Sequence, residues 1–234
     1  MGANIETSGL RVKHLGRIDY SEALQRMLEF NAHRTADCAD EIWLLEHFPV
    51  FTRGVSCTLD PHSNPTQIPV IDSDRGGQIT YHGPGQLIAY LLFDLKRHRR
   101  GVRRLVHDIE ESIIVTLEDF GIEAKRRTGA PGVYVDGRKI ASLGLRVRSG
   151  YTYHGLSLNI DMDLKPFTLI DPCGIEDLEV VNVVDCLATS EKLPVGSTSR
   201  GSMEKGMRDA LIDTLVRELS TRAAKPLSSA DHYE

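Results

Sequence analysis

Residues 75–86, with the sequence RGGQITYHGPGQ, combine glycines with side chains that can bind a ligand. Glycine allows the backbone to approach a ligand closely. Backbone N–H groups exposed in this way can hold a carbonyl or an oxyanion. Two tight turns that only join strands would use the same residue types, so the segment suits either a binding loop or a structural connection.

One of the four cysteines lies in a setting that presents its side chain rather than buries it. Cys173 stands between Pro172, which fixes its own φ, and Gly174, which frees the backbone. An exposed thiol can serve as a nucleophile once it loses its proton. Cys186 lies in the apolar segment VVDCL (183–187), which predicts a core position. The two other cysteines, with no obvious partner in the sequence, are Cys38 and Cys57.

Lys139 is the candidate general base. It follows a predicted Asp136-Gly137 turn and precedes small and apolar residues. Strand alternation places Arg138 and Lys139 on opposite faces, so only one of them can point inward. Burial of an amine favours its neutral form and lets it accept a proton, although a solvent-exposed lysine is the commoner arrangement at a hairpin end.

Three histidines also have residue types suited to a site. His82 ends a predicted strand before a Gly-Pro-Gly turn, and His154 precedes Gly155. Each suits a hydrogen-bonded structural position as well as a ligand contact. For the pair Glu46-His47 the structural interpretation is favoured.

Composition and charge restrict the class of protein. The chain has 234 residues, of which 41% are hydrophobic and 26% charged, as in soluble globular domains. The longest apolar run, residues 87–93, is far shorter than the roughly 20 residues of a membrane helix. Without an apolar leader or close cysteine pairs, we expect reduced thiols and a cytoplasmic location. Motifs for phosphate loops, dinucleotides and zinc are absent, so we expect no cofactor.

The net charge is −5, yet positive charge is concentrated in one stretch. A local basic stretch in an acidic protein indicates that an acidic partner docks there. A second, smaller cluster lies at 125–127. The basic residues of the first stretch are Lys96, Arg97, Arg99, Arg100, Arg103 and Arg104, with His98 among them.

The hydrophobic pattern predicts an α+β fold. We expect a mixed, largely antiparallel sheet with helices packed on one side. Residues 48–54 are predicted as a turn and 55–67 as a polar loop. A single domain should span 1–222, followed by a polar, disordered tail at 223–234. The predicted helices are 19–34, 102–120 and 203–221, and the predicted strands are 41–47, 68–72, 78–82, 86–94 and a three-strand meander over 132–160.

Several motifs together resemble the lipoyl(octanoyl) transferases, the lipoate–protein ligase B family. The first is RGGQITYHGPGQ (75–86), and the others follow in the order known for that family. The resemblance covers roughly residues 10–220. The other motifs are EHFPVFT (46–52), FDL (93–95), APGVYV (130–135), KIASLG (139–144), HGLSLN (154–159) and DPCG (171–174).

The resemblance implies a fold, an activity and partners. The fold is that of the biotin/lipoate protein ligase superfamily, an α/β domain around a mixed sheet. The activity is transfer of an octanoyl group from octanoyl-acyl carrier protein to a lysine of a lipoyl domain, in lipoate biosynthesis. The acceptors would be lipoyl domains of 2-oxoacid dehydrogenase complexes or the glycine cleavage H protein. We expect a monomer that binds neither nucleic acid nor a membrane.

The same resemblance implies roles for individual residues. Cys173 would carry the acyl group as a thioester, and Lys139 would lower the pKa of that thiol. Ser157 and Asp171 are mild departures, because the family often has Ala and Asn there. The implied substrate-binding residues are Arg75, Gly76, Gly77, Gln78, Ile79, Thr80, Tyr81, His82, Ser142, Leu143, Gly144, Gly155, Leu156 and Ser157.

The residues also suggest details of the pocket. An apolar tunnel for an eight-carbon chain could be lined by Tyr81, Leu143, Leu156 and Leu158. Backbone N–H groups near Gly76-Gly77 or Leu143-Gly144 are candidates for the oxyanion hole.

Three alternative functions remain open on the sequence. One is an ATP-dependent lipoate or biotin ligase of the same fold, which needs no thiol nucleophile. The second is a non-catalytic module that binds an acyl-carrier protein. The third is a cysteine hydrolase that pairs Cys173 with His82 or His154.

Overall fold

The computed structural model of the chain describes residues 5–7, 9–57, 61, 64–65, 67–175, 178–188 and 200–220. The predicted tail at 223–234 lies outside these residues, so the domain boundary at 222 stays a prediction. In the described part of the chain, no helix combines the length and apolarity that crossing a membrane would require.

Among the described residues, eight strands form one mixed sheet in the order β1-β2-β3-β7-β11-β10-β9-β8. The β2–β3 pair is parallel and the other pairs are antiparallel, as the predicted mixed, largely antiparallel sheet requires. The bounds are β1 Ile5–Thr7, β2 Leu10–Ile18, β3 Asp40–His47, β7 Gln86–Leu92, β8 Lys125–Arg126, β9 Gly132–Val135, β10 Arg138–Arg148 and β11 Tyr151–Asn159.

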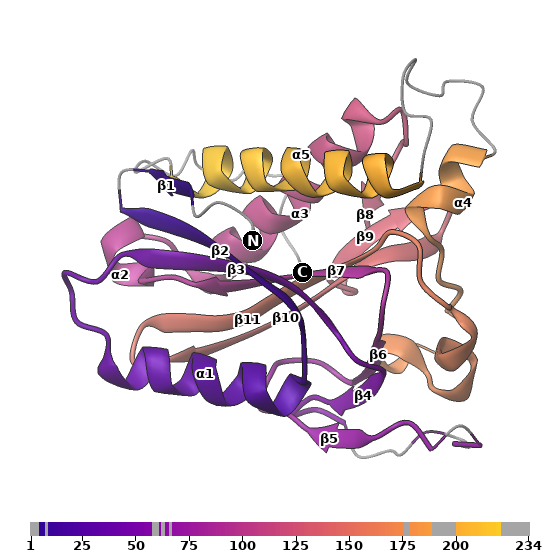
Figure 1. Cartoon of the computed structure of the whole chain (residues 1–234), viewed down its shortest axis with the longest axis horizontal. Coiled ribbons are helices and arrows are strands. Elements are labelled where there is room, and N and C mark those ends of the chain that lie inside the picture. Colours follow the sequence, from indigo (N-terminus) through magenta and orange to yellow (C-terminus); the bar gives the residue numbers. More distant parts are fainter. Residues whose placement is uncertain are drawn as a thin grey trace.

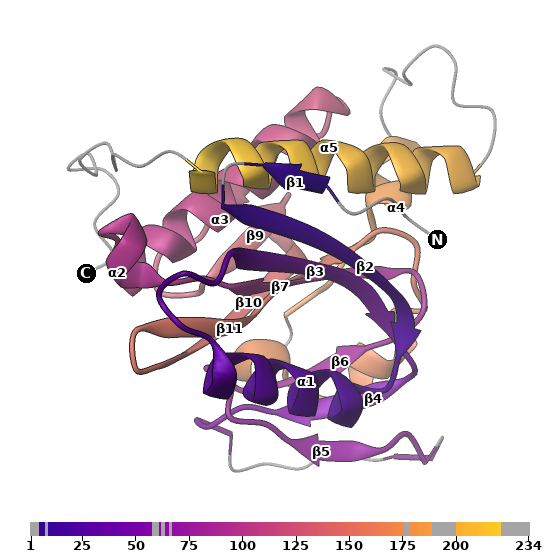
Figure 2. The same ribbon diagram turned by 60° about the vertical axis from the view of Figure 1, so that its left-hand side comes forward.

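Helices cover both faces of this sheet, so the prediction of helices on one side is wrong. Helix α3 (Val102–Asp119) and helix α5 (Arg200–Ser220) lie on one face, and α1 (Tyr20–His33) lies on the other (Figures 1 and 2). The physical reason is the two-sided burial of β7, which is buried at every position. Alternate residues of a strand face opposite sides. Leu87 and Leu91 therefore join the α3–α5 core, whereas Ile88 and Tyr90 join the α1 core.

A second, three-stranded sheet packs below the first, beside α1 (Figure 2). It consists of β5 (Val70–Asp72), β4 (Val50–Arg53) and β6 (Ile79–His82), in that order. Residues 48–54 were predicted as a turn, but Val50–Arg53 pair with both neighbours. This pairing is non-local, which is why the short segment VFTR did not reveal it.

Short helices connect the larger elements. Helix α2 (Leu95–His98) follows β7, and α4 (Val183–Ala188) precedes the last described segment. Two 3-10 helices, η1 (Lys165–Leu169) and η2 (Pro172–Gly174), fall where turns were predicted. Cys186 lies in α4 and is buried, as predicted.

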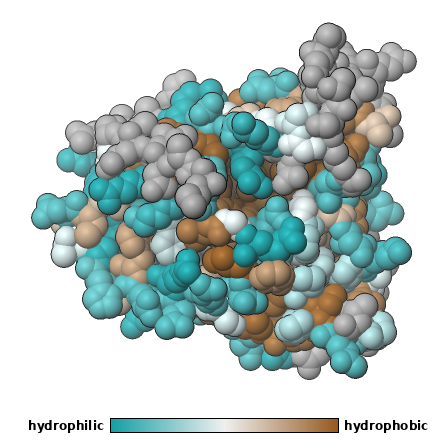
Figure 3. Space-filling view, viewed as in Figure 1, coloured by the Kyte–Doolittle hydropathy of each residue, from teal (hydrophilic) through white to brown (hydrophobic). Residues whose placement is uncertain are grey.

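The face of the molecule in Figure 3 is mostly hydrophilic, and its hydrophobic areas are small and scattered.

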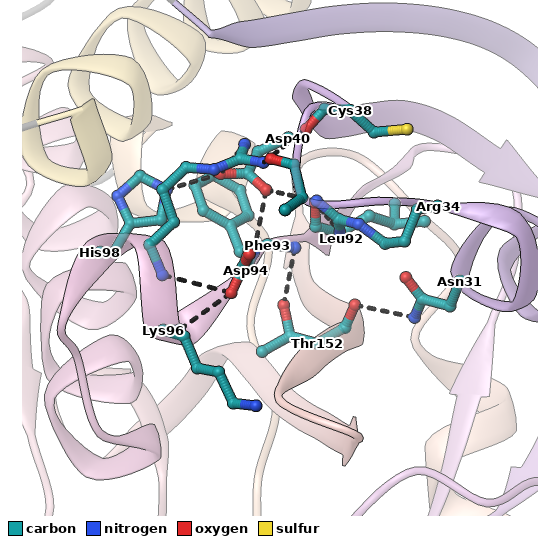
Figure 4. Close-up of polar contacts among 12 residues, drawn as sticks. Asn31, Arg34, Cys38, Asp40, Leu92, Phe93, Asp94, Lys96, His98 and Thr152 are labelled. Atoms are coloured by element: carbon teal, nitrogen blue, oxygen red, sulfur yellow. Dashed lines mark hydrogen bonds and ion pairs between the residues drawn. The ribbon is translucent and has the colours of Figure 1, made fainter.

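Asp40 is the centre of a buried polar cluster that joins α1, β3, β7 and α2 (Figure 4). Its Oδ1 accepts hydrogen bonds from Arg34 at 2.6 Å and from the Asp94 backbone N–H at 2.9 Å. Its Oδ2 lies 2.6 Å from Nε2 of His98. Burial opposes ionisation of Asp40, but the hydrogen bonds from His98, Arg34 and Asp94 lower the pKa of this carboxyl below its usual value. The side chains of Asp40 and Arg34 are at most 2% exposed.

We expect Asp40→Ala to reduce the free energy of unfolding by about 3–5 kcal/mol, because it leaves the Arg34 guanidinium buried without its carboxylate. Asp72→Ala is the matched control. Asp72 also pairs with an arginine, Arg53 at 2.7 Å, but its side chain is 79% exposed. Its loss should cost less than about 1 kcal/mol. Urea denaturation of both variants checks this prediction, and similar losses in the two would contradict it.

Candidate active site

A cavity lies where β6, β7, β10 and β11 meet. Its walls come from the loop before β6, from the middle of the β10–β11 hairpin and from the aromatic residues of α1 and β7. The lining residues are Tyr20, Arg75, Gly77, Gln78, Ile79, Thr80, His82, Ile88, Tyr90, Ser142, Leu143, Gly144, His154, Gly155, Leu156 and Ser157.

The structure brings together most of the substrate-binding residues that the sequence predicted. Their three segments are far apart in the chain and meet around this one cavity. Gly76 and Tyr81 are not among the lining residues. The predicted residues that line it are Arg75, Gly77, Gln78, Ile79, Thr80, His82, Ser142, Leu143, Gly144, Gly155, Leu156 and Ser157.

The placement of Gly76 and Tyr81 has a clear cause. The Gly76 N–H is donated to the Leu145 carbonyl at 3.1 Å, which occupies this candidate oxyanion donor. The Tyr81 ring packs against Phe51 and Phe167, with ring centroids 5.5 and 5.6 Å away. Leu158, the other expected tunnel residue outside the lining, belongs to the main core.

The cavity has a volume of about 50 Å³. Benzene, with six carbons, occupies an apolar cavity of about 150 Å³. An eight-carbon chain therefore needs the lining side chains to move apart before it can enter.

Arg75 holds the glycine-rich segment against β4. Its Nε and terminal nitrogens donate to the hydroxyl and carbonyl oxygens of Thr52 at 2.6–3.1 Å, and another bond reaches the Gly76 carbonyl at 3.0 Å. Both Arg75 and Thr52 are buried. The guanidinium thus fixes the backbone of one cavity wall.

Buried aromatic and imidazole rings form another part of the cavity wall. The Tyr20 ring stacks on His82 and on His154, with centroids 6.1 and 6.5 Å away. Burial lowers the pKa of His82 to about 3 and that of His47 to about 4. Both rings are therefore neutral at pH 7. His47 Nε2 lies 2.6 Å from the Tyr90 hydroxyl, whose pKa burial raises.

His154 is anchored by an acidic residue that sequence reasoning missed. Its Nε2 lies 2.8 Å from Oδ1 of Asp74, and the Tyr153 hydroxyl donates to the other oxygen of that carboxylate. Burial lowers the pKa of His154, while Asp74 opposes this effect. Tyr20 and Tyr90 also escaped notice, because only the fold brings them to residues 62 and 64 positions away.

Lys139 points into the protein and is 1% exposed, so the common solvent-exposed arrangement does not apply. Its Nζ donates to the Pro131 carbonyl at 2.9 Å and lies 5.3 Å from the centre of the Tyr134 ring. Arg138, on the opposite face, is partly exposed, as strand alternation requires. Sequence reasoning missed Pro131 as the partner of the amine.

The segment around Cys173 reaches Lys139 through the backbone. Residues Pro172–Gly174 form η2, which contacts β6. A few residues later, the Glu179 carbonyl accepts from the Lys139 N–H at 2.8 Å, and the Val181 N–H donates to the Lys139 carbonyl at 3.0 Å. The side chain of Cys173 lies outside the described part of the structure. A groove of about 700 Å³, with Asp171, Pro172 and Arg138 among its lining residues, adjoins η2.

The fold is shared with protein ligases of known structure. A bipartite lipoate protein ligase from Thermoplasma acidophilum aligns over 94% of this chain and 88% of that chain, with a TM-score of 0.62 and 15% identity. A biotin protein ligase from Aquifex aeolicus, in complex with biotin and ATP, aligns over 90% of this chain and 72% of that chain, with a TM-score of 0.54 and 13% identity. The predicted biotin/lipoate protein ligase fold is confirmed.

Closer relatives narrow the class. The lipoyl protein ligase A/B catalytic domain matches residues 19–197. The octanoyltransferase of Shewanella denitrificans is 55% identical over 210 residues, which are 90% of this chain and 87% of that protein. The octanoyltransferase of Laribacter hongkongensis is 47% identical over 217 residues, 93% of this chain and 97% of that protein. The chain therefore belongs to the lipoyl protein ligase A/B family, and the predicted resemblance to octanoyltransferases is confirmed.

The buried histidines predict how stability depends on pH. The pKa values of His47 and His82 are about 4 and 3 in the folded state and about 6.5 in an unfolded chain. Below pH 6.5 the unfolded chain therefore binds protons that the folded protein does not. Their contribution to stability is complete above this pH and is lost as the pH falls toward 4.

We expect His47→Gln to reduce the slope of unfolding free energy against pH by about 1 kcal/mol per pH unit between pH 6 and 4.5. His33→Gln is the control, because His33 is exposed. Urea denaturation across this range checks the prediction. A slope that is equal in the wild type and in His47→Gln would show that the His47 ring does not carry this effect.

Proposed function

We propose that this protein is an octanoyltransferase that carries the octanoyl group on Cys173 and uses Lys139 as the proton-transfer partner of that thiol. The donor is octanoyl-acyl carrier protein, and the acceptor is a lysine of a lipoyl domain. The observation that carries the proposal is the buried Lys139 amine, whose backbone is hydrogen-bonded to the segment that follows η2. The octanoyltransferases among its relatives support the reaction class.

The first half-reaction forms a thioester. The Cys173 thiolate attacks the carbonyl carbon of the donor thioester and gives a tetrahedral intermediate. This intermediate collapses and expels the thiolate of the carrier's prosthetic arm, which takes a proton from the Lys139 ammonium. The thiol of Cys173 and the amine of Lys139 titrate as one coupled pair.

The second half-reaction forms an amide. The neutral amine of the acceptor lysine attacks the Cys173 thioester, and Lys139 takes the proton that the new amide nitrogen loses. The Cys173 thiolate leaves and is ready for the next turnover. Exchange of one thioester for another is nearly balanced in energy, and conversion of a thioester to an amide is favourable, so the reaction needs no ATP.

The basic stretch at 96–104 has two kinds of residue in the structure. Arg100 and Arg104 pair with Asp108 at 3.3 and 2.6 Å, and Arg97 donates to the backbone carbonyls at 36 and 38. Lys96, Arg99 and Arg103 are exposed and form no ion pair in the described part of the chain. Figure 4 shows the Lys96 ammonium directed away from Asp94. We call these three residues the carrier patch, because exposed cations on an anchored helix suit an acidic carrier protein.

An ATP-dependent ligase is the second candidate, because structural relatives include ligases. A cysteine hydrolase is disfavoured. His82 is fully buried with a pKa of about 3, and Asp74 occupies Nε2 of His154.

We expect intact mass spectrometry to detect one octanoyl adduct after the protein is mixed with octanoyl-acyl carrier protein without ATP. Cys173→Ala should abolish the adduct, because no thiol remains to form the thioester. Cys38→Ala is the matched control, because hydrogen bonds from Thr35 lower the pKa of the Cys38 thiol. Loss of the adduct in Cys38→Ala would refute Cys173 as the acyl carrier. An absolute requirement for ATP would favour the ligase.

We expect the triple variant Lys96→Gln/Arg99→Gln/Arg103→Gln to raise KM for the carrier protein about tenfold while kcat changes less than twofold, because exposed charges mainly guide association. The dependence of kcat/KM on salt should also become weaker. The control is Lys125→Gln/Arg127→Gln, at the other end of the sheet order. Steady-state kinetics at two salt concentrations checks this, and a wild-type KM in the triple variant would refute the carrier patch.

A further inference from the structure

Glu110 is a fully buried carboxylate in the middle of α3. A buried carboxylate is costly unless hydrogen bonds and charges compensate it. One oxygen, Oε1, accepts the Gly132 N–H at 2.8 Å. The other, Oε2, lies 3.3 Å from Nε of Arg126. Glu110 therefore reaches from the helix to the first residue of β9.

The Gly132 N–H belongs to the same peptide unit as the Pro131 carbonyl. That carbonyl is the acceptor for Lys139 Nζ, at 2.9 Å. A peptide unit is planar and rigid, so its N–H and C=O point in opposite directions and turn together. A carboxylate on one side of this unit and an amine on the other are thus joined through one rigid group.

The backbone of Gly132 makes this arrangement specific. Its φ is +141°, which side chains other than hydrogen rarely allow. A Cβ atom at this position would lie 2.5 Å from Cε of Lys139 and 2.7 Å from the Ala141 carbonyl oxygen. The Lys139 side chain therefore lies directly against the peptide that Glu110 holds, and a rotation of that peptide would displace the amine.

We propose that Glu110 is a positioning residue for Lys139 and acts through the Pro131–Gly132 peptide. This inference rests on the proposed function, in which Lys139 exchanges protons with the Cys173 thiol. Glu110 touches no reacting atom. Its hydrogen bond fixes the direction of the Pro131 carbonyl, and the carbonyl fixes the position of Nζ.

The neighbouring residue separates this role from charge balance for Arg126. Glu111 also pairs with Arg126, at 2.6 Å, and its side chain is 41% exposed. Arg126 has a carboxylate partner at Glu111 even when Glu110 is lost. The contribution of Glu110 that Glu111 lacks is the hydrogen bond to Gly132.

The test is the first-order rate of acyl-adduct formation at saturating octanoyl-acyl carrier protein. Misplacement of a reacting group by about 1 Å can cost about 100-fold. We expect Glu110→Ala to slow the step 10- to 100-fold with less than a twofold change in the donor concentration for half-maximal rate. Glu110→Gln keeps an acceptor oxygen for Gly132 and should recover most of the rate. Glu111→Gln should match the wild type.

A spectroscopic measurement accompanies the kinetics. The amide proton of Gly132 should move upfield in Glu110→Ala, because its charged acceptor is gone, and only slightly in Glu111→Gln. Folded fractions from urea denaturation normalise every rate. A wild-type rate in folded Glu110→Ala would overturn the inference, as would an equal loss in Glu110→Ala and Glu110→Gln.

Two further samples separate failure of this inference from failure of the proposed function. If Lys139→Ala acylates Cys173 as fast as the wild type, or if the wild type forms no adduct, the proposed function fails. If the wild type and Lys139→Ala behave as proposed while Glu110→Ala equals the wild type, only the role of Glu110 fails.

Discussion

The buried amine of Lys139 is the constraint on which the site depends. An ammonium group removed from water needs compensating partners, and those described here come from several parts of the chain. The Pro131 carbonyl accepts from Nζ, the Tyr134 ring lies beside it, and the 178–181 segment holds the backbone on both sides. A register shift in the β9–β10 pair falls directly after Lys139. The hairpin, the strand before it and the segment after η2 are thus brought together at this residue.

The polar groups of the cavity make its walls rigid. Arg75 binds Thr52 and the Gly76 carbonyl, Asp74 anchors His154, and His82 Nδ1 lies 2.8 Å from the Gln86 side chain. Most of these groups have partners within the protein, so the cavity keeps few donors for a ligand. This suits an acyl chain, whose binding comes mainly from burial of apolar surface at about 0.8 kcal/mol per CH₂. The small volume of the cavity places the cost of opening on its apolar residues.

Local chemistry explains which features were predictable. Asp136 and Gly137 have φ values of +50° and +79°, as the predicted turn requires, and Gly121 ends α3 at +78°. The strand β2 was missed because LRVKHLGRI lacks regular alternation, and its parallel partner β3 lies more than 20 residues away. The burial of Lys139 was equally hidden from a reading of the hairpin, since its partners include Glu179 and Val181, some 40 residues further on. Asp74 precedes a recognised motif, but only the fold shows its bond to His154.

Helix α3 links two regions that a transfer reaction must keep in fixed relation. Arg103 of the carrier patch lies in its first turn, and Glu110 follows about two turns later, roughly 10 Å along the axis. The helix is packed against the sheet along its buried side, so its two ends move as one body. A carrier protein that grips the beginning of this helix is thereby measured off against the amine by a ruler of constant length. Insertion of a single residue between the two points would rotate one by about 100° relative to the other, which makes the spacing within this helix as much a part of the enzyme as any side chain in the cavity.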